Sequence, residues 1–186
     1  MKNLLRVGLW VGSGAALAVL MLELLLHLLP VAGRGVYAAE YDPAWPINHL
    51  LPHSTFTYSA GWKLDLVNEG SVNNMGYVAP FDYQRDAGGV AILGDSYIEN
   101  LMNDYPVTLQ GRLPALLHEP MPVLPFGSSG ASMPDYLAVA RLVADRFHPQ
   151  WGVVLISEAD FTEGFSPVPG YYGWDPQKDP PIRFTM

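Results

Sequence analysis

The 186-residue sequence contains no cysteine. Disulfide bonds are therefore excluded as a source of stability, and so are zinc and iron–sulfur sites with cysteine ligands. A chain of this length can form one domain with a hydrophobic core and is too short for two comfortable ones. The core alone must hold the fold together, and we expect no metal site and no cofactor.

Basic residues are also scarce, with 10 lysines and arginines against 18 aspartates and glutamates. Lys2, Arg6 and Glu23 belong to the N-terminal segment, which leaves 8 basic and 17 acidic residues, a net charge of −9, in the rest of the chain. Nucleic acids and anionic lipid surfaces are bound by clustered positive charge. This balance argues against both as partners.

A long apolar run occupies residues 7–29. A helix needs about 20 such residues to cross the hydrocarbon of a bilayer. Lys2 and Arg6 precede the run and only Arg34 follows closely, so the positive-inside rule predicts a cytoplasmic N-terminus and a periplasmic domain at a bacterial inner membrane. A cleavable signal peptide is the alternative, since residues 36–38 offer small side chains for cleavage; the length of the run favours an uncleaved anchor.

Glu23 and His27 interrupt the apolar run and stand four positions apart, on one face of the predicted helix. Ionisable groups in hydrocarbon are costly unless they are paired. We therefore expect these two side chains to bond to each other or to groups on a neighbouring membrane helix. His27 as an axial ligand of a haem or chlorophyll-type pigment is a sharper alternative. Either way, the polar stripe points to a partner in the membrane.

Composition divides the chain after the anchor of residues 1–30. Residues 31–67 are rich in proline, glycine and aromatic residues without helical periodicity, and predict an irregular neck. Residues 68–160 predict an α/β domain. Residues 161–186 hold five prolines and six aromatic residues and predict a tail. With Trp174 as a candidate anchor, this tail either docks on a partner or wraps its own domain.

Apolar runs alternate with helical periods in the predicted domain. Residues 90–93, 121–126 and 151–156 predict strands, and the last run is typical of a strand buried on both faces. Helices are predicted over about 106–118 and from a capping box at Ser132. Such strand–helix–strand repeats imply right-handed crossovers. They favour a three-layer α/β/α sandwich with a mainly parallel sheet.

The first predicted strand ends in Gly94, Asp95 and Ser96. A parallel strand delivers such a serine to the carboxyl edge of the sheet. There it acts as a nucleophile if a base and oxyanion donors stand beside it. The simpler interpretation is a strand-to-helix turn kept for its geometry.

This Gly-Asp-Ser resembles the first block of the SGNH (GDSL-like) hydrolases and their membrane-anchored acyltransferase relatives. The resemblance covers roughly residues 68–161 and includes an Asn-x-x-Gly-Tyr element at residues 73–77. It implies an SGNH-like fold, with Ser96 as the nucleophile and Gly127 as a second oxyanion donor. It also implies that Asp160 is the acidic residue of the third block.

The sequence departs from the family at positions that carry its chemistry. Pro125 and Ala159 replace family asparagines, and the second of these normally donates to the oxyanion. Loss of one such donor costs on the order of 100- to 1,000-fold in rate. The family's base is a histidine near the C-terminus, and no histidine follows His148. The letters of residues 145–148 match that motif, but we expect them at the opposite end of the sheet from Ser96.

Other residues of the chain are candidate bases. The candidates are the neck residues His49 and His53 and the carboxylates Glu99, Asp104, Glu158 and Asp160. Carboxylates are poor bases for a serine unless burial raises their pKa.

The sequence therefore predicts a membrane-anchored periplasmic SGNH-like domain without hydrolytic activity. It would serve as an accessory subunit of a larger membrane complex, either energy-transducing or envelope-assembling, bound through the helix and the tail. The alternative is a serine esterase or O-acyltransferase that uses Ser96 on an ester or an envelope glycan. The family's domain usually continues beyond the matched region, so we expect a C-terminally short version of that fold.

Overall fold

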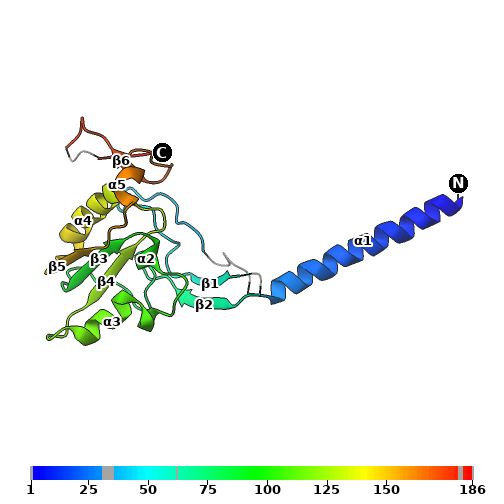
Figure 1. The fold of residues 1–186 in the computed structure, drawn as a ribbon, viewed down its shortest axis with the longest axis horizontal. Coiled ribbons are helices and arrows are strands. Elements are labelled where there is room, and N and C mark those ends of the chain that lie inside the picture. Colours follow the sequence, from blue (N-terminus) through cyan, green and yellow to red (C-terminus); the bar gives the residue numbers. More distant parts are fainter. Residues whose placement is uncertain (1, 31–35, 62, 180–181, 186) are drawn as a thin grey trace.

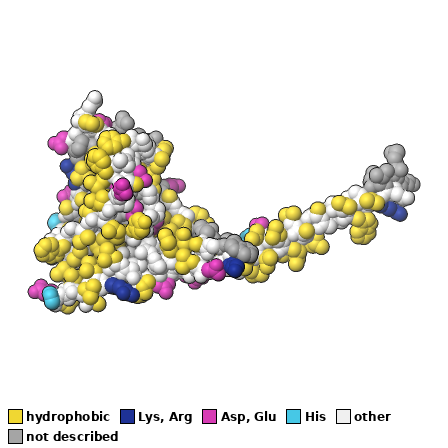
Figure 2. All heavy atoms as spheres, viewed as in Figure 1, with side chains coloured by type: hydrophobic (Ala, Val, Ile, Leu, Met, Phe, Trp, Pro, Cys, Tyr) yellow, Lys and Arg dark blue, Asp and Glu magenta, His cyan; other side chains and the backbone are white. Residues whose placement is uncertain are grey.

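The computed structural model describes residues 2–30, 36–61, 63–179 and 182–185. A single long helix, α1 (Lys2–Leu28), extends away from a packed α/β unit (Figure 1). Figure 2 shows hydrophobic side chains along the length of α1. Its segment Arg6–Leu28 is long and apolar enough to cross a membrane, and none of it is buried against the rest of the chain. The predicted N-terminal apolar helix is confirmed.

The centre of the α/β unit is a three-stranded parallel sheet. Strand β3 (Val90–Gly94) lies between β4 (Val123–Gly127) and β5 (Trp151–Val154), parallel to both. The predicted α/β class with a mainly parallel sheet is therefore confirmed.

Helices pack against β3 and β4 from two sides. Helix α4 (Met133–Phe147) covers one face. The short α2 (Ser96–Glu99) and α3 (Leu109–Leu116) cover the other. The first core cluster includes Ala91, Leu93, Leu124, Phe126, Val139, Val143 and Phe147; the second includes Val90, Ile92, Ile98 and Val123. Because successive residues of β3 alternate between two apolar layers, the strand reads as a continuous apolar run.

The helices begin where the sequence supplies caps. At α4 the Ser132 backbone N–H donates to the Asp135 side chain at 2.9 Å, as the predicted capping box requires. Thr108 caps α3 by accepting from the Gly111 N–H at 3.1 Å. The predicted helix over 106–118 is divided, because a 3-10 turn, η1 (Tyr105–Val107), precedes α3.

Strand β5 lies at the edge of the sheet, and all four of its residues are exposed. Trp151 is 65% exposed and Ile156, just beyond the strand, is 54% exposed. The expectation that 151–156 is buried on both faces is wrong for the described chain. An apolar run shows only that a strand is able to be buried. Whether it is buried depends on the elements that pack against it, and neither α4 nor α3 covers β5 here.

Part of the predicted neck belongs to the packed domain. Trp45 and Ile47 are buried in the first core cluster, beside Tyr77 and Phe126. Beyond them, β1 (Thr55–Ala60) and β2 (Leu66–Ser71) form an antiparallel hairpin. The domain therefore begins at or before Trp45 rather than at residue 68, because large aromatic side chains fill the core without any periodic pattern. Residues 31–35 of the neck lie outside the described chain.

The tail packs on its own domain. After α5 (Asp160–Glu163), strands β6 (Tyr172–Trp174) and β7 (Ile182–Phe184) form a small antiparallel hairpin. Both strands contact α4, and Ile182 is buried. Of the two alternatives for the tail, wrapping its own domain is the one seen.

Candidate functional site

Ser96 is the first residue of α2, directly beyond the end of the central strand. Asp95 caps this helix through its carboxylate, which accepts from the Tyr97 N–H at 2.9 Å. Asn100 ends the helix in the left-handed conformation. The Ser96 side chain is half-buried, and its hydroxyl forms no hydrogen bond with any other residue that the structure describes. The serine is at the predicted edge of the sheet, without a bonded base.

Gly127 ends β4 beside Gly94, at the same edge of the sheet. A Cβ atom at this position would lie 2.1 Å from the backbone nitrogen of Glu99 and 2.5 Å from the carbonyl carbon of Ile98. Real Cβ atoms do not approach backbone so closely, so only glycine lets β4 end against α2. This packing accounts for Gly127 without any catalytic role.

His148 lies at the opposite, amino edge of the sheet. Its Nδ1 is 2.7 Å from Oδ1 of Asp86, and the Gly88 N–H donates to the Phe147 carbonyl at 2.8 Å, just before β3 begins. A five-residue strand spans roughly 15 Å, which separates His148 from Ser96. The letters of the family's Asp-x-x-His motif at 145–148 therefore do not supply a base.

The neck histidines have other partners. Nδ1 of His49 donates to the Ile47 carbonyl at 2.7 Å. The His53 ring lies 3.8 Å from the Asp82 carboxylate. Neither forms a hydrogen bond or ion pair with Ser96 among the described residues.

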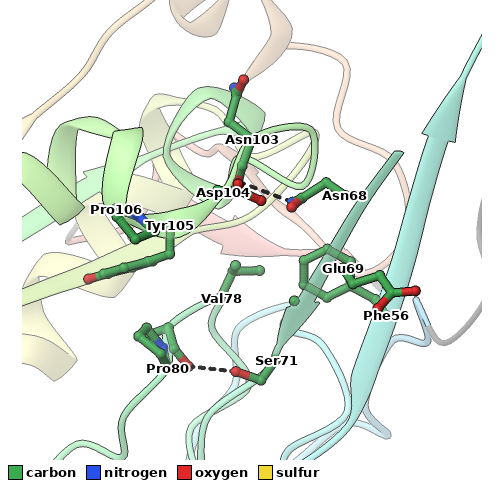
Figure 3. Close-up of a pocket in the computed structure, with 12 residues that line it drawn as sticks. Phe56, Asn68, Glu69, Ser71, Val78, Pro80, Asn103, Asp104, Tyr105 and Pro106 are labelled. Carbon is green, nitrogen blue, oxygen red and sulfur yellow. Dashed lines mark hydrogen bonds between the residues drawn. The ribbon is translucent and has the colours of Figure 1, made fainter. Parts of the chain in front are cut away.

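Asp104 lines a separate groove, of about 330 Å³, between the β1–β2 hairpin and η1 (Figure 3). Asn68 reaches across from β2, and its Nδ2 donates to the carbonyls of Leu101 at 2.8 Å and Asn103 at 3.1 Å. This amide ties the hairpin to the loop that follows α2. Asp104 thus faces the hairpin, and the remaining acidic candidate of the third block, Glu158, is exposed to solvent.

Glu99 and Asp160 are buried and bonded to structural partners. The Ser129 hydroxyl donates to Glu99, and burial raises the pKa of the Glu99 carboxyl. Asp160 is 1% exposed and accepts from the Ser157 N–H at 2.8 Å, from the Ser157 hydroxyl, and from the Tyr136 hydroxyl at 2.9 Å. Asp160 therefore links the segment that follows β5 to α4.

Ala159 immediately precedes α5 and presents only a methyl group. It has no N–H on its side chain to offer an oxyanion. Of the groups that the resemblance implies, the structure brings Ser96 and Gly127 to one edge. In the described part of the chain, neither a histidine nor the third-block amide lies there.

Asp135 is a buried carboxylate whose involvement the sequence indicated only as a helix cap. Besides Ser132, it accepts from the Tyr172 N–H in the tail hairpin at 2.8 Å. It is 3% exposed, and burial raises its pKa to about 6. The long-range bond to Tyr172 could not be predicted, because nothing in the local pattern pairs a helix cap with a tail strand.

The raised pKa of Asp135 predicts that stability falls as pH rises. The folded chain keeps this proton up to about pH 6, whereas the unfolded chain loses it near 3.8. Between these values the folded state binds more protons, so its free energy of unfolding declines by about 3 kcal/mol in total. Urea unfolding from pH 4 to pH 7, compared with Asp135→Asn, measures this. Parallel pH profiles for the two proteins would contradict the assignment.

Glu23 and His27 pair within α1. Nδ1 of His27 lies 2.9 Å from the Glu23 carbonyl oxygen and 3.6 Å from its carboxylate. The two side chains thus lie close enough to pair within α1, and a contact with a neighbouring membrane helix stays a prediction. Both side chains lie on the outer surface of the helix.

Trp174 belongs to an exposed aromatic cluster formed with Phe161 and Phe165. Its indole N–H donates to the Phe161 carbonyl at 3.2 Å, and the ring centroids lie 5.9 Å and 6.3 Å from those of the two phenylalanines. With Pro176 these rings line a shallow apolar hollow of about 240 Å³. The hollow offers contact area and carries no polar group for chemistry.

Within the described residues, no group of three or more histidine, aspartate or glutamate side chains is arranged to hold a metal ion. Comparison with known protein families, curated proteins and solved structures gave no match.

Proposed function

We propose that this chain is a single-pass, membrane-anchored accessory protein whose periplasmic domain has an SGNH-like three-layer fold and does not hydrolyse esters. The anchor is α1. Its N-terminus lies in the cytoplasm, because the basic residues Lys2 and Arg6 are at that end and the positive-inside rule keeps such residues on the cytoplasmic side. The domain contributes binding surface to a larger membrane complex.

The observation that carries the proposal is the isolation of the Ser96 hydroxyl. A serine nucleophile needs a base within hydrogen-bond reach and donors for the oxyanion. His49, His53 and His148 have other partners, and Ala159 offers no donor. His118 lies between α3 and the start of β4, at the amino side of the sheet. Glu99 and Asp160 are engaged in bonds that hold the edge together. These carboxylates therefore have a structural role at the carboxyl edge of the sheet.

Exposed apolar surface supports the accessory role. Residues 151–156 are all exposed to solvent, and Phe161 and Phe165 are 55% and 62% exposed. Soluble monomers rarely expose large contiguous apolar patches, and such patches mark contacts with other proteins or membranes. An accessory subunit would bury these residues in its complex.

Ester turnover tests the catalytic half of the proposal. The full-length chain in detergent micelles, given p-nitrophenyl acetate, is expected to release nitrophenol at the same rate as its Ser96→Ala variant. The physical reason is that, among the described residues, no base is bonded to the Ser96 hydroxyl. A rate for the unaltered chain that exceeds the variant's by tenfold or more would contradict the proposal.

A serine esterase or O-acyltransferase is the second candidate function. It is favoured by the position of Ser96 at the start of α2, beyond the central strand and close to the α2–Gly127 contact. This function requires a base that the described residues do not place beside Ser96, recruited from an unusual place or from another chain. It predicts Ser96-dependent turnover only when that base is present.

A further inference from the structure

The hairpin formed by β6 and β7 closes part of the carboxyl edge of the sheet. It lies beside the first turns of α4 (Figure 1). The Tyr172 N–H donates to Asp135 at 2.8 Å. The backbone of Tyr171 pairs with Thr185 at the base of the hairpin, at 2.9 Å. These bonds place the Tyr171 side chain over the loop that follows β4.

The Tyr171 hydroxyl joins two segments that are distant in sequence. It donates to the Ser129 carbonyl at 2.6 Å and accepts from Nδ2 of Asn48, also at 2.6 Å. Ser129 in turn donates through its hydroxyl to Glu99, one turn after Ser96 on α2. One side chain of the tail therefore connects the neck, the loop after β4 and, through Ser129, the helix that carries Ser96.

A small cavity lies beneath this connection. Its volume is about 10 Å³, and its polar lining comes from Asn48, Ser128, Asp135, Tyr136 and Tyr171. A space of this size admits about one water molecule. Gly94, the last residue of β3, forms part of the wall. The closed hairpin thus leaves no room for a larger molecule at this part of the edge.

We propose that the β6–β7 hairpin is a latch, whose Tyr171 holds the neck at Asn48 and the loop at Ser128–Ala131 closed over the carboxyl edge. Release of the latch separates these two segments and enlarges the cavity between them. The latch concerns access to the edge and holds whether or not Ser96 is catalytic.

The hairpin is suited to open before the rest of the domain unfolds. Each of its strands has three residues, and a two-stranded hairpin of this size is marginally stable on its own. Ile182 is its buried apolar contact in the described part, so hydrogen bonds carry much of the attachment. They are the bonds of Tyr171 and Tyr172 and those of Trp174 to the Gly164 carbonyl at 2.9 Å and the Phe161 carbonyl at 3.2 Å. Segments with few buried contacts have the lowest free energies of opening.

Asp135 makes the latch sensitive to pH. The titratable side chains that face it are Tyr136 on α4 and Tyr171 and Tyr172 in the hairpin segment, and burial raises the pKa of all three, so they stay neutral near pH 7. Further out, the carboxylates of Asp95 and Asp160 raise the pKa of Tyr136, and that of Glu99 raises the pKa of Tyr171. Opening returns water to Asp135 and lowers its pKa toward 3.8, so the closed form holds the proton more tightly and acid favours closure.

Hydrogen exchange of the full-length chain in detergent tests the latch, with Tyr171→Phe as the variant. It removes both hydroxyl bonds and keeps the ring. Protection at residues 46–50 and 128–131 is expected to fall together on the order of tenfold, the loss typical of one or two hydrogen bonds. Tyr172→Phe is the matched control, since no bond of its hydroxyl is found among the described residues.

The proposal is overturned if Tyr171→Phe loosens residues 170–174 alone and leaves 128–131 protected as before. It is equally overturned if both tyrosine variants exchange alike. A second arm compares protection factors, corrected for intrinsic exchange, at pH 5 and pH 7.5. Closure is expected to weaken at the higher pH in the unaltered chain and to lose this dependence in Asp135→Asn; an unchanged dependence in Asp135→Asn contradicts the role of Asp135.

Discussion

Replacing Phe126 by alanine is expected to lower the free energy of unfolding by about 3–5 kcal/mol, the usual cost of removing a fully buried ring. Phe126 is 2% exposed on β4. Its ring centroid lies 5.0 Å from that of Tyr77, 5.3 Å from Tyr83 and 5.5 Å from Phe147. The cavity left behind would be walled by rings from two different parts of the chain, the connection between β2 and β3 and the helix α4, so it cannot collapse easily.

Urea unfolding followed by circular dichroism measures this loss on the full-length chain in detergent. Phe165→Ala is the matched control, because this ring is 62% exposed and its removal is expected to change stability by less than about 0.5 kcal/mol. Equal losses for the two variants would mean that β4 and α4 do not enclose Phe126 as described.

Gly127→Ala is expected to destabilise the domain by about 3 kcal/mol, the upper end of the usual cost of overpacking a core. The added methyl group meets the backbone of Glu99 and Ile98, which cannot rotate aside as a side chain can. Either α2 shifts, and with it Ser96, or β4 separates from β3. The same unfolding measurement detects the loss.

Gly152→Ala is the control for this second substitution. Gly152 lies in β5, and a Cβ atom there would meet nothing within 4 Å. Its replacement is expected to leave stability within about 0.5 kcal/mol. If Gly127→Ala were equally harmless, the close approach of β4 to α2 would be absent, and a catalytic reason for this glycine would regain weight.

The parts of the fold that the sequence predicted are those with local causes. The apolar run of β3 and the capping box at Ser132 are written in adjacent residues. The burial of Trp45 and the exposure of Trp151 were not predictable in the same way. Both depend on which distant segments pack nearby, and aromatic residues in an irregular segment carry no period that reveals it.

The candidate site was predictable to a similar extent. The strand-to-helix turn at Ser96 and the placement of His148 at the far edge follow from the order of the parallel strands. The bonds of Glu99 to Ser129 and of Asp135 to Tyr172 join residues 30 and 37 positions apart. Sequence spacing does not reveal such partners. The hydrogen bonds to them give Glu99 and Asp135 a structural role. The resemblance to SGNH hydrolases stays a prediction.

The most direct measurement is intact-mass analysis of the full-length chain after incubation with a fluorophosphonate, which reacts with activated serines. The proposed scaffold role predicts no mass increase, since no residue that the structure describes is bonded to the Ser96 hydroxyl as a base. Stoichiometric labelling that disappears in Ser96→Ala and is retained in Ser129→Ala would contradict the account and restore the catalytic interpretation.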